Sequence, residues 1–291
     1  MTQSRANSWT VLLSIVIAWV PAMTTSSYAW GNGKYYDYGW FVPPIALYLL
    51  LRRWKESSSS PTRPLAPWSI IGWLLVFAPT VFVFRSLHYA DPLWRLPMGA
   101  LATMAVLTTH GFLAASKGWK ASLSFWLVTG LALSAIPWPI PIENRMVQEL
   151  THGVIVTVTE IFQWLGKPVV MTGDRLQLHA ATVEVTDGCS GIRSFQSFLM
   201  AALFFAEFQR LRWQAFLKLL LYALITAFLI NVFRTWLLAE IRFTRGETAF
   251  NDAHDVLGLG AFLVSGFIFY VISGKLAEHP KRQIIIIRQQ R

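Results

Sequence analysis

Residues 67–84 read PWSIIGWLLVFAPTVFVF, a run of 18 residues without a charged side chain. The hydrocarbon core of a bilayer is about 30 Å thick, and a helix that spans it needs roughly 20 mostly apolar residues. The run therefore predicts a transmembrane helix. Similar stretches recur along the chain and predict about eight spans, at residues 9–26, 39–51, 67–84, 97–115, 121–138, 190–207, 214–233 and 254–274.

The composition agrees with an integral membrane protein. Of the 291 residues, 54% are hydrophobic and 14% are charged, whereas a soluble domain carries roughly 25% charged residues. An ordinary water-soluble protein is excluded, because too few polar side chains are left to cover a surface in water. We predict an all-α integral membrane protein that forms a single polytopic domain over residues 1–291.

The net charge of +10 orients the chain in its membrane. With eight spans and the N-terminus inside, 15 of the 25 Lys and Arg residues fall on the cytoplasmic side, with three of the 15 Asp and Glu residues. This bias is the positive-inside pattern of membrane proteins. We therefore expect cytoplasmic N- and C-termini, and no nucleic acid as a partner.

The first residues allow a second interpretation. Arg5, the apolar run 11–20 and the triplet Ser27-Tyr28-Ala29 are also typical of a cleavable signal peptide. We favour an uncleaved first span, and the orientation of the chain is the same in both cases.

Residues 139–188 differ from the rest and predict an extracytoplasmic insertion. The segment that leads into it is too rich in proline to be helical. Residues 143–165 then predict a helix that lies at the interface or packs on the bundle, and Gly166 is expected to end it. Alternating branched residues around a Gly173-Asp174 turn predict a β-hairpin cap before the sixth span.

Cys189 is the only cysteine of the chain, so no intramolecular disulfide is possible. A lone cysteine in a membrane helix is usually a small apolar filler. Here Asp187-Gly188 predicts a helix start that puts the sulfur near the positive end of the helix dipole, and Arg193 is expected one turn further on. Such surroundings favour a thiolate, although Asp187 acts in the opposite direction. Cys189 is therefore a candidate nucleophile.

Two further groups are expected at the outer ends of neighbouring spans. Asn231 and Arg234 are three residues apart and share one helix face; Arg234 is either functional or a side chain that snorkels to the interface. His254 opens the eighth span and can carry a proton near neutral pH, with Asp252 or Asp255 to orient its ring. The same cluster also fits a helix cap. If functional, these groups supply the proton carrier and the oxyanion donor that a thiolate needs.

The remaining residues give no second constellation. No pair of histidines has metal-ligand spacing, and a single cysteine excludes zinc sites built from several cysteines. Phosphate-binding glycine loops and nucleic-acid modules are also missing from the sequence. We expect neither a metal nor a cofactor.

Residues 185–195 read VTDGCSGIRSF, and Asn231-x-x-Arg234 and His254 follow in order. This arrangement resembles the motifs of the exosortase/archaeosortase family. Residues 38–44, YGWFVPP, also resemble the family's N-terminal segment, but they lack its Ser-His pair. The likeness covers about residues 35–275.

The resemblance implies a bacterial exosortase-type membrane cysteine protease or transpeptidase in the inner membrane, with its active site on the periplasmic face. Its expected partners are membrane lipids and secreted proteins that end in a short motif such as Pro-Glu-Pro, a spanning helix and a basic tail. The resemblance assigns the nucleophile, the oxyanion-binding or substrate-orienting cation and the general acid/base to Cys189, Arg234 and His254, with Arg193, Asn231 and Asp255 in supporting roles.

Two alternatives stay open. A non-enzymatic transporter or export component of an exopolysaccharide system would make Cys189 incidental. A membrane hydrolase would use the same residues, but water would resolve the thioester.

Overall fold

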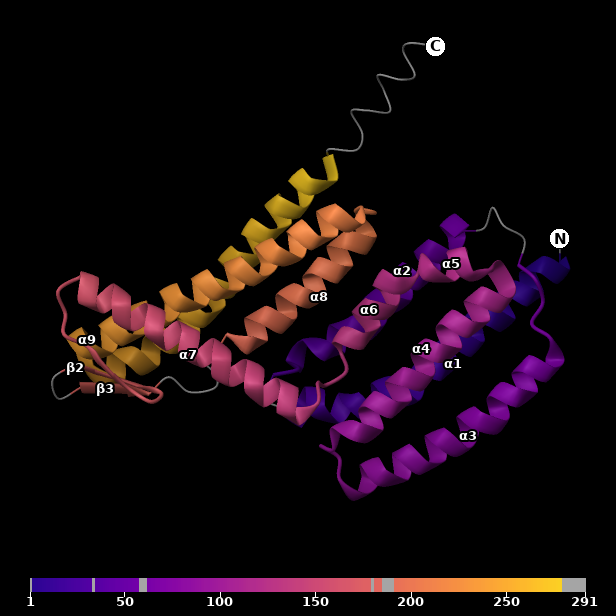
Figure 1. Cartoon of the computed structure of the whole chain (residues 1–291), viewed down its shortest axis with the longest axis horizontal. Coiled ribbons are helices and arrows are strands. Elements are labelled where there is room, and N and C mark those ends of the chain that lie inside the picture. The colour runs from indigo at the N-terminus through magenta and orange to yellow at the C-terminus, as the bar shows by residue number, and fades with distance from the viewer. Residues whose placement is uncertain (1, 33–34, 58–61, 179–180, 185–190, 279–291) are drawn as a thin grey trace, which may run out of the picture. The chain divides into compact units, whose positions relative to one another are not determined.

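The computed structural model describes residues 2–32, 35–57, 62–178, 181–184 and 191–278, without the side chains of residues 2–6, 181, 254, 255, 261, 262 and 278. The chain forms two compact units, Met1–Ile140 and Pro141–Arg291 (Figure 1). Each unit has an apolar core of its own.

The first unit is a helical bundle. Its long helices are α1 (Thr2–Asn32), α3 (Pro67–Ala90) and α4 (Arg95–Lys117). The shorter elements are the 3-10 helix η1 (Asp37–Phe41) and the helices α2 (Val42–Glu56), α5 (Trp119–Leu123) and α6 (Trp126–Ser134).

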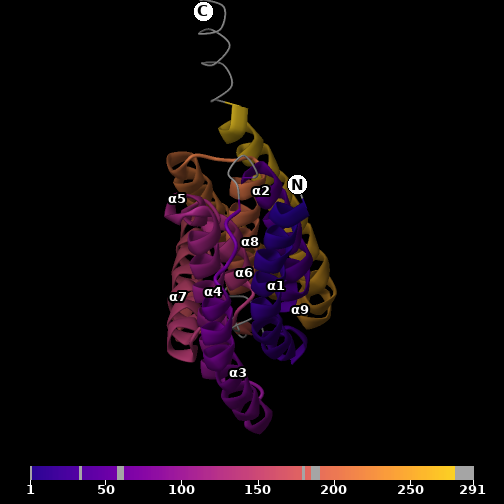
Figure 2. The same ribbon diagram turned by 90° about the vertical axis from the view of Figure 1, so that its right-hand side faces the viewer.

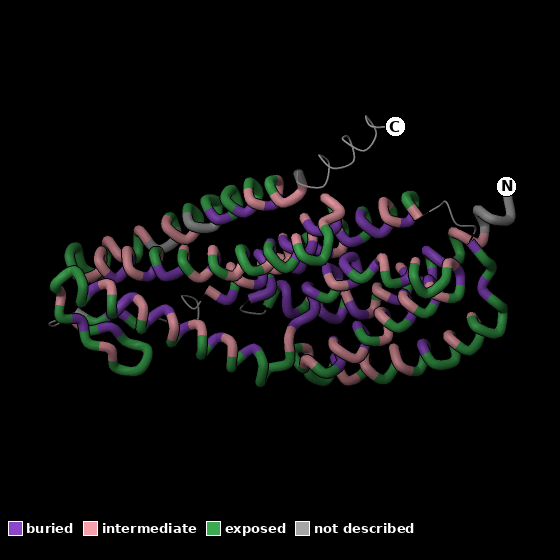
Figure 3. Tube along the Cα trace, turned by 45° about the horizontal axis from the view of Figure 1, so that its top comes forward, coloured by how far each residue is buried: buried purple, intermediate pink, exposed green. Residues whose placement is uncertain are grey.

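Small side chains allow α1 to lie against α4 (Figures 1 and 2). Ala22 and Ala29 of α1 and Ala102 of α4 belong to one buried cluster, and such residues let membrane helices approach closely. Helix α3, in contrast, is exposed over most of its length (Figure 3), with Phe77 and His88 as its buried residues. An apolar helix exposed in this way is expected where lipid is the solvent.

Hydrogen bonds tie η1 and the end of α1 to the end of α6. Tyr38 donates its hydroxyl to the carbonyl of Ser134 at 2.6 Å, and the indole of Trp30 donates to the carbonyl of Ala135 at 2.7 Å. Gly39 lies directly against the indole, because an added Cβ would come within 2.4 Å of Trp30 Cδ1. Only glycine fits there without displacing the tryptophan.

The second unit consists of α7 (Ile140–Trp164), a three-stranded sheet, α8 (Ile192–Phe208) and α9 (Trp213–Glu278). The strands β1 (Val170–Thr172), β2 (Arg175–Leu178) and β3 (Ala181–Glu184) are antiparallel and adjacent in chain order. The core joins α7, the sheet and α9 through one buried cluster that includes Val154, Val158, Phe162, Leu176, Val183, Val232 and Ala239.

Helix α9 doubles back at Gly246, whose φ of 84° and ψ of −170° are not helical. The two halves lie side by side (Figure 1). Residues at equal distances from Gly246 meet: Arg234 contacts Gly258, and Ala223 shares a buried cluster with Phe269. An ion pair between Arg242 and Glu247, at 3.0 Å, crosses the reversal.

The structure confirms a helical membrane protein, but it does not confirm the count of eight spans. Five stretches within the described helices are long and apolar enough to cross a bilayer, namely Asn7–Asn32, Pro67–Ala90, Arg95–Lys117, Trp213–Ala253 and Val256–Ala277. Of the other expected spans, α2 and α8 have 15 and 17 residues.

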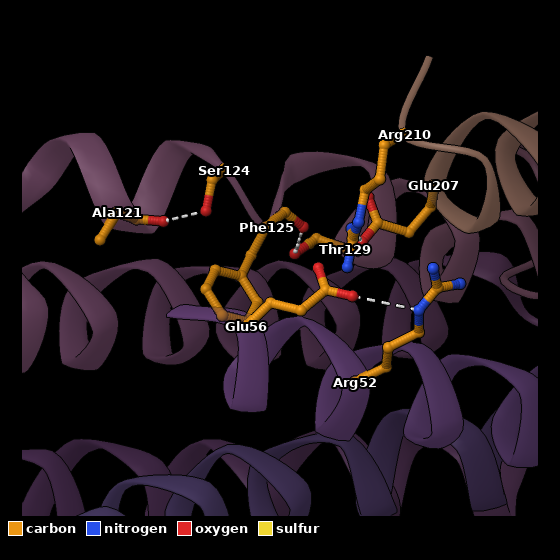
Figure 4. A network of polar contacts seen from close by, with 8 residues as sticks. All are labelled: Arg52, Glu56, Ala121, Ser124, Phe125, Thr129, Glu207 and Arg210. Atoms are coloured by element: carbon orange, nitrogen blue, oxygen red, sulfur yellow. Dashed lines mark hydrogen bonds and ion pairs between the residues drawn. The ribbon is translucent and has the colours of Figure 1, made fainter. Parts of the chain in front are cut away.

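The span expected at residues 121–138 is divided between α5 and α6. Ser124 lies at the break and donates its hydroxyl to the carbonyl of Ala121 at 2.7 Å (Figure 4). Short polar side chains that bond nearby carbonyls compete with helix continuation. The apolar run does not reveal this interruption.

The predicted helix and β-structure of residues 139–188 are present within the described part of the chain. Gly166 ends α7 as expected: at φ 74° it allows Lys167 N–H to bond Phe162 O at 2.9 Å, which caps the last turn. The Gly173-Asp174 turn is also confirmed, since Thr172 pairs with Arg175. A third strand, however, extends the expected hairpin into a small sheet. The extracytoplasmic position of this segment stays a prediction.

We predict that Gly246→Ala destabilises the second unit. The backbone conformation at this residue is essentially restricted to glycine, and forcing it on another residue costs about 1–3 kcal/mol. The midpoint of thermal unfolding in detergent should therefore fall.

The matched control is Gly260→Ala. An added Cβ meets no heavy atom within 4 Å at either glycine, so only the backbone conformation differs. Gly260 lies in regular helix, where alanine is expected to be neutral or slightly stabilising. Equal shifts for the two variants would contradict a glycine-specific reversal.

Candidate functional site

Gly191 and Asn231 join the start of α8 to the middle of α9. Gly191 precedes α8 with φ 80° and ψ 4°, a left-handed conformation that suits glycine. An added Cβ at Gly191 would lie 2.8 Å from Cγ of Asn231, which is itself buried. The chain thus enters α8 in direct contact with the Asn231 side chain.

The contact places Asn231 beside the N-terminus of α8. The first N–H groups of a helix have no partner within it and make its N-terminus a favourable place for negative charge. This end of α8 therefore offers positive potential beside Asn231.

Arg234 lies one turn along α9 from Asn231, on the same helix face, as predicted. Its guanidinium packs on Gly258 in the returning half of α9: an added Cβ there would lie 3.5 Å from Nη2 and 3.6 Å from Nε. These distances are ordinary van der Waals contacts, so alanine would fit at position 258, whereas a longer side chain would meet the guanidinium. The reversal at Gly246 makes the contact, because both residues are twelve positions from it.

The same stretch of α9 also receives the end of the sheet. Strand β3 contacts α9, and Val183 shares a buried cluster with Val232 and Ala239. The chain therefore leaves α9 after β3 and returns to it at Gly191. Residues 185–190 connect these two points and lie outside the described residues.

Cys189 belongs to that connecting segment, so its predicted position lies outside the described residues. His254 and Asp255 lie in the returning half of α9, but their side chains are not described. His254 is one helical turn before Gly258, the residue that contacts Arg234. The structure brings Asn231, Arg234 and Gly258 together and leaves the roles of the other candidates as predictions.

The sixth helix begins later than expected. The sequence predicts a helix start at Asp187-Gly188, with Arg193 one turn beyond Cys189 on the same face. Helix α8 begins at Ile192, directly after the left-handed Gly191. Arg193 is exposed in the first turn of α8, and its relation to Cys189 lies outside the described residues.

Thr235 is a residue that the sequence analysis missed. Its side chain is 3% exposed, and its hydroxyl has no hydrogen-bond partner within the described structure. Other helical threonines, such as Thr159 and Thr244, donate to the carbonyl four residues earlier. A buried hydroxyl without a partner costs stability, and this one adjoins Arg234. Its place directly after Arg234, beyond the apolar run 214–233, gave no signal in the sequence.

Lys167 and Glu240 hold the sheet and α7 to α9. The ammonium group contacts both carboxylate oxygens, at 2.6 Å for Oε2, and lies 6.0 Å from the centre of the Phe162 ring. Both side chains are partly exposed. The pair fixes the start of the sheet to the half of α9 that carries Arg234.

Among the residues whose side chains are described, no group of three or more His, Cys, Asp or Glu could hold a metal ion. The described part of the site instead offers an arginine, an asparagine amide, a hydroxyl and a helix N-terminus. All are neutral or positive, and all can donate hydrogen bonds. Such a set suits a developing negative charge on oxygen.

Comparison with known proteins identifies the family of the chain. The family model of transmembrane exosortases matches residues 30–271, which cover most of both units and every candidate site residue. No curated protein and no solved structure matches the chain. The extent of the family match shows that the chain belongs to the transmembrane exosortase family.

Proposed function

We propose that this exosortase is a membrane cysteine protease/transpeptidase that cleaves a C-terminal sorting signal through a thioester on Cys189. The observation that carries the proposal is the convergence on one stretch of α9. Gly191, two residues after Cys189, contacts Asn231, and Arg234 contacts Gly258, one turn from His254. Two peptide units span at most about 7 Å, so chain connectivity limits how far Cys189 lies from Asn231.

The proposed reaction begins with attack by the Cys189 thiolate on a substrate carbonyl carbon. The new C–S bond produces a tetrahedral oxyanion, which Arg234 and the start of α8 stabilise. When the C–N bond breaks, protonated His254 gives its proton to the departing amine. An amine, a hydroxyl or water then attacks the thioester, loses its proton to His254 and releases the cysteine.

Supporting roles follow from chemistry and position. Asn231 is a hydrogen-bond donor for the substrate backbone beside Gly191. Arg193 adds positive charge at the start of α8, and Asp255 is proposed to orient the imidazole of His254.

The proposed substrates are secreted proteins with a short recognition motif, a spanning helix and a basic tail. The substrate's helix would lie in the bilayer with its basic end in the cytoplasm. Cleavage then takes place on the periplasmic side of the inner membrane, with both termini of the enzyme in the cytoplasm.

The orientation predicts how the sole cysteine reacts in intact cells. A membrane-impermeant maleimide added from outside, after the outer membrane is made permeable, should label the wild-type chain and leave Cys189→Ser unlabelled. A chain that reacts only after the inner membrane is lysed would contradict a periplasmic cysteine.

Substitution of the three proposed catalytic residues tests the reaction. In cells that co-express a secreted reporter with the three-part tail, Cys189→Ala should abolish processing, because no other thiol is present. Arg234→Ala should slow it about 100- to 1000-fold, the usual effect of losing an oxyanion donor. His254→Ala should slow it at least about 100-fold. Processing is measured by the mass shift of the reporter.

Matched controls are exposed residues of the same kind. Arg245→Ala removes an arginine three turns further along α9, and His152→Ala removes a histidine of α7; both should process the reporter like the wild type. Normal processing by Cys189→Ala would overturn the enzyme and favour a transporter or export component. The mass of the product separates transfer to an acceptor from hydrolysis.

Thr235 gives a test in which activity and stability change in opposite directions. We propose that its hydroxyl bonds the substrate beside Arg234. Thr235→Val should then lower processing about tenfold, the effect of one lost hydrogen bond of ordinary strength. The same change should raise the thermal midpoint, because it removes a buried hydroxyl without a partner in the described structure.

Thr235→Ser is the matched control, since it keeps the hydroxyl. It should retain most of the processing activity. A Thr235→Val enzyme that loses stability and activity together would show that the hydroxyl serves the fold instead.

A further inference from the structure

The first unit encloses an apolar cavity of about 240 Å³. Its walls are formed by α1, α2 and α6, with one residue from α4. Side chains that define it include Val20, Met23, Ala46, Leu47 and Phe125. An engineered cavity of about 150 Å³ is large enough to bind benzene, so this one has room for several methylene groups.

Every side-chain donor in the cavity wall already has a hydrogen-bond partner. Thr109 accepts from the Trp19 indole at 3.0 Å and donates to Ala105 O at 2.7 Å. Thr129 donates to Phe125 O at 3.1 Å (Figure 4), and Thr24 donates to Val20 O at 2.8 Å. A buried water needs two to four polar partners. The wall leaves no side-chain donor for water, is otherwise apolar, and suits an apolar occupant.

The bilayer supplies such an occupant. Val20 and Leu47 line the cavity and are 51% and 43% exposed, so the cavity reaches the surface of the unit. Helix α1 is long and apolar enough to span a membrane. Hydrocarbon chains surround a helix that spans a bilayer, and an empty cavity would leave its walls without dispersion contacts. An acyl chain is also much narrower than a helix, which is about 10–12 Å across. The cavity therefore suits an acyl chain better than a helix of another protein.

A positive charge lies beside the same cavity. Arg85 donates to the hydroxyl of Thr24, a cavity residue, at 2.7 Å and to the hydroxyl of Tyr89 at 3.1 Å. Arg85 is the only Lys or Arg of α3, and among the described residues it forms no ion pair with a carboxylate. An arginine within an apolar span indicates a functional partner. Its planar group has five donors and suits a phosphate.

We infer that the cavity and Arg85 form one binding site for a membrane phospholipid. One acyl chain fills the cavity between α1, α2 and α6, and the phosphate contacts the Arg85 guanidinium above Thr24. Neither the cavity nor the Arg85 contact depends on Cys189 or on the reaction proposed for it.

Photo-crosslinking of the full chain in nanodiscs tests the site. The probes are a phosphatidylglycerol and a diacylglycerol that carry the same diazirine in one acyl chain, and peptide mass spectrometry locates the adducts. In the wild type, phosphatidylglycerol adducts should concentrate on α1 and α2 and exceed those of diacylglycerol about tenfold, as expected for a charge-assisted contact.

Two substitutions test the contributions of the cavity and of the Arg85 charge separately. Ala46→Phe should fill the cavity and lower the α1 and α2 adducts of both probes at least about fivefold, whereas Ala78→Phe, on the exposed side of α3, should not. Arg85→Gln should lower the phosphatidylglycerol signal to that of diacylglycerol, and Arg85→Lys should retain part of the preference. Val20→Trp, from the opposite wall, repeats the filling test if Ala46→Phe does not fold.

Three results would overturn the inference. The first is labelling spread evenly over all exposed helices and unchanged by Ala46→Phe and Val20→Trp. The second is equal labelling by the two probes in the wild type. The third is recovery of a protein segment from the cavity in place of lipid. None of these measurements uses reporter processing, so failure here is distinct from failure of the proposed function.

Discussion

The reversal of α9 at Gly246 determines which residues of the second unit meet. A chain that turns back at one residue pairs positions at equal distances from it, and each helical half then presents a fixed face to the other. Arg234 consequently lies on Gly258, and Phe269 joins the cluster that contains Ala223. The sheet and α7 pack on the first half of α9, the half that carries Arg234.

The second unit holds its polar groups close to irregular backbone. A bilayer offers no partner to free N–H and C=O groups, which limits spanning segments to helices and confines irregular backbone to protein-lined or aqueous regions. The left-handed Gly191, the sheet and the reversal at Gly246 are all departures from helix. Asn231 and Arg234 lie on the regular helix beside two of these departures. Rigid helix thus positions the side chains, while irregular segments bring other parts of the chain to them.

Much of this fold could be predicted, because its strongest signals are local. Long apolar runs identified five membrane-length stretches, and Gly166 and Gly173-Asp174 marked a helix end and a turn. The break near Ser124 and the start of α8 at Ile192 depend on individual hydrogen bonds and on one left-handed residue, which hydropathy does not register. The first half of α9 also continues well past its apolar run, because polar residues are compatible with helix.

The site was predictable in its residue types more than in its contacts. The spacing of Asn231 and Arg234 placed them on one helix face. Gly258 and Thr235 carried no signal, since one is distinguished by the guanidinium that packs beside it and the other by lacking a bond that similar residues make. Such roles depend on tertiary packing.

The ion pair across Gly246 also bears on how α9 enters a membrane. A helical hairpin inserts with its closed end on one side and both open ends on the other. Residues 242–252 carry Arg242, Arg245, Glu247 and Asp252, so the closed end has no net charge, and the Arg242–Glu247 pair brings opposite charges together. The flanks of the open end carry Arg210, Arg212 and Lys275. In the proposed orientation the closed end that crosses the membrane carries no net charge, and the basic flanks of the open end stay in the cytoplasm.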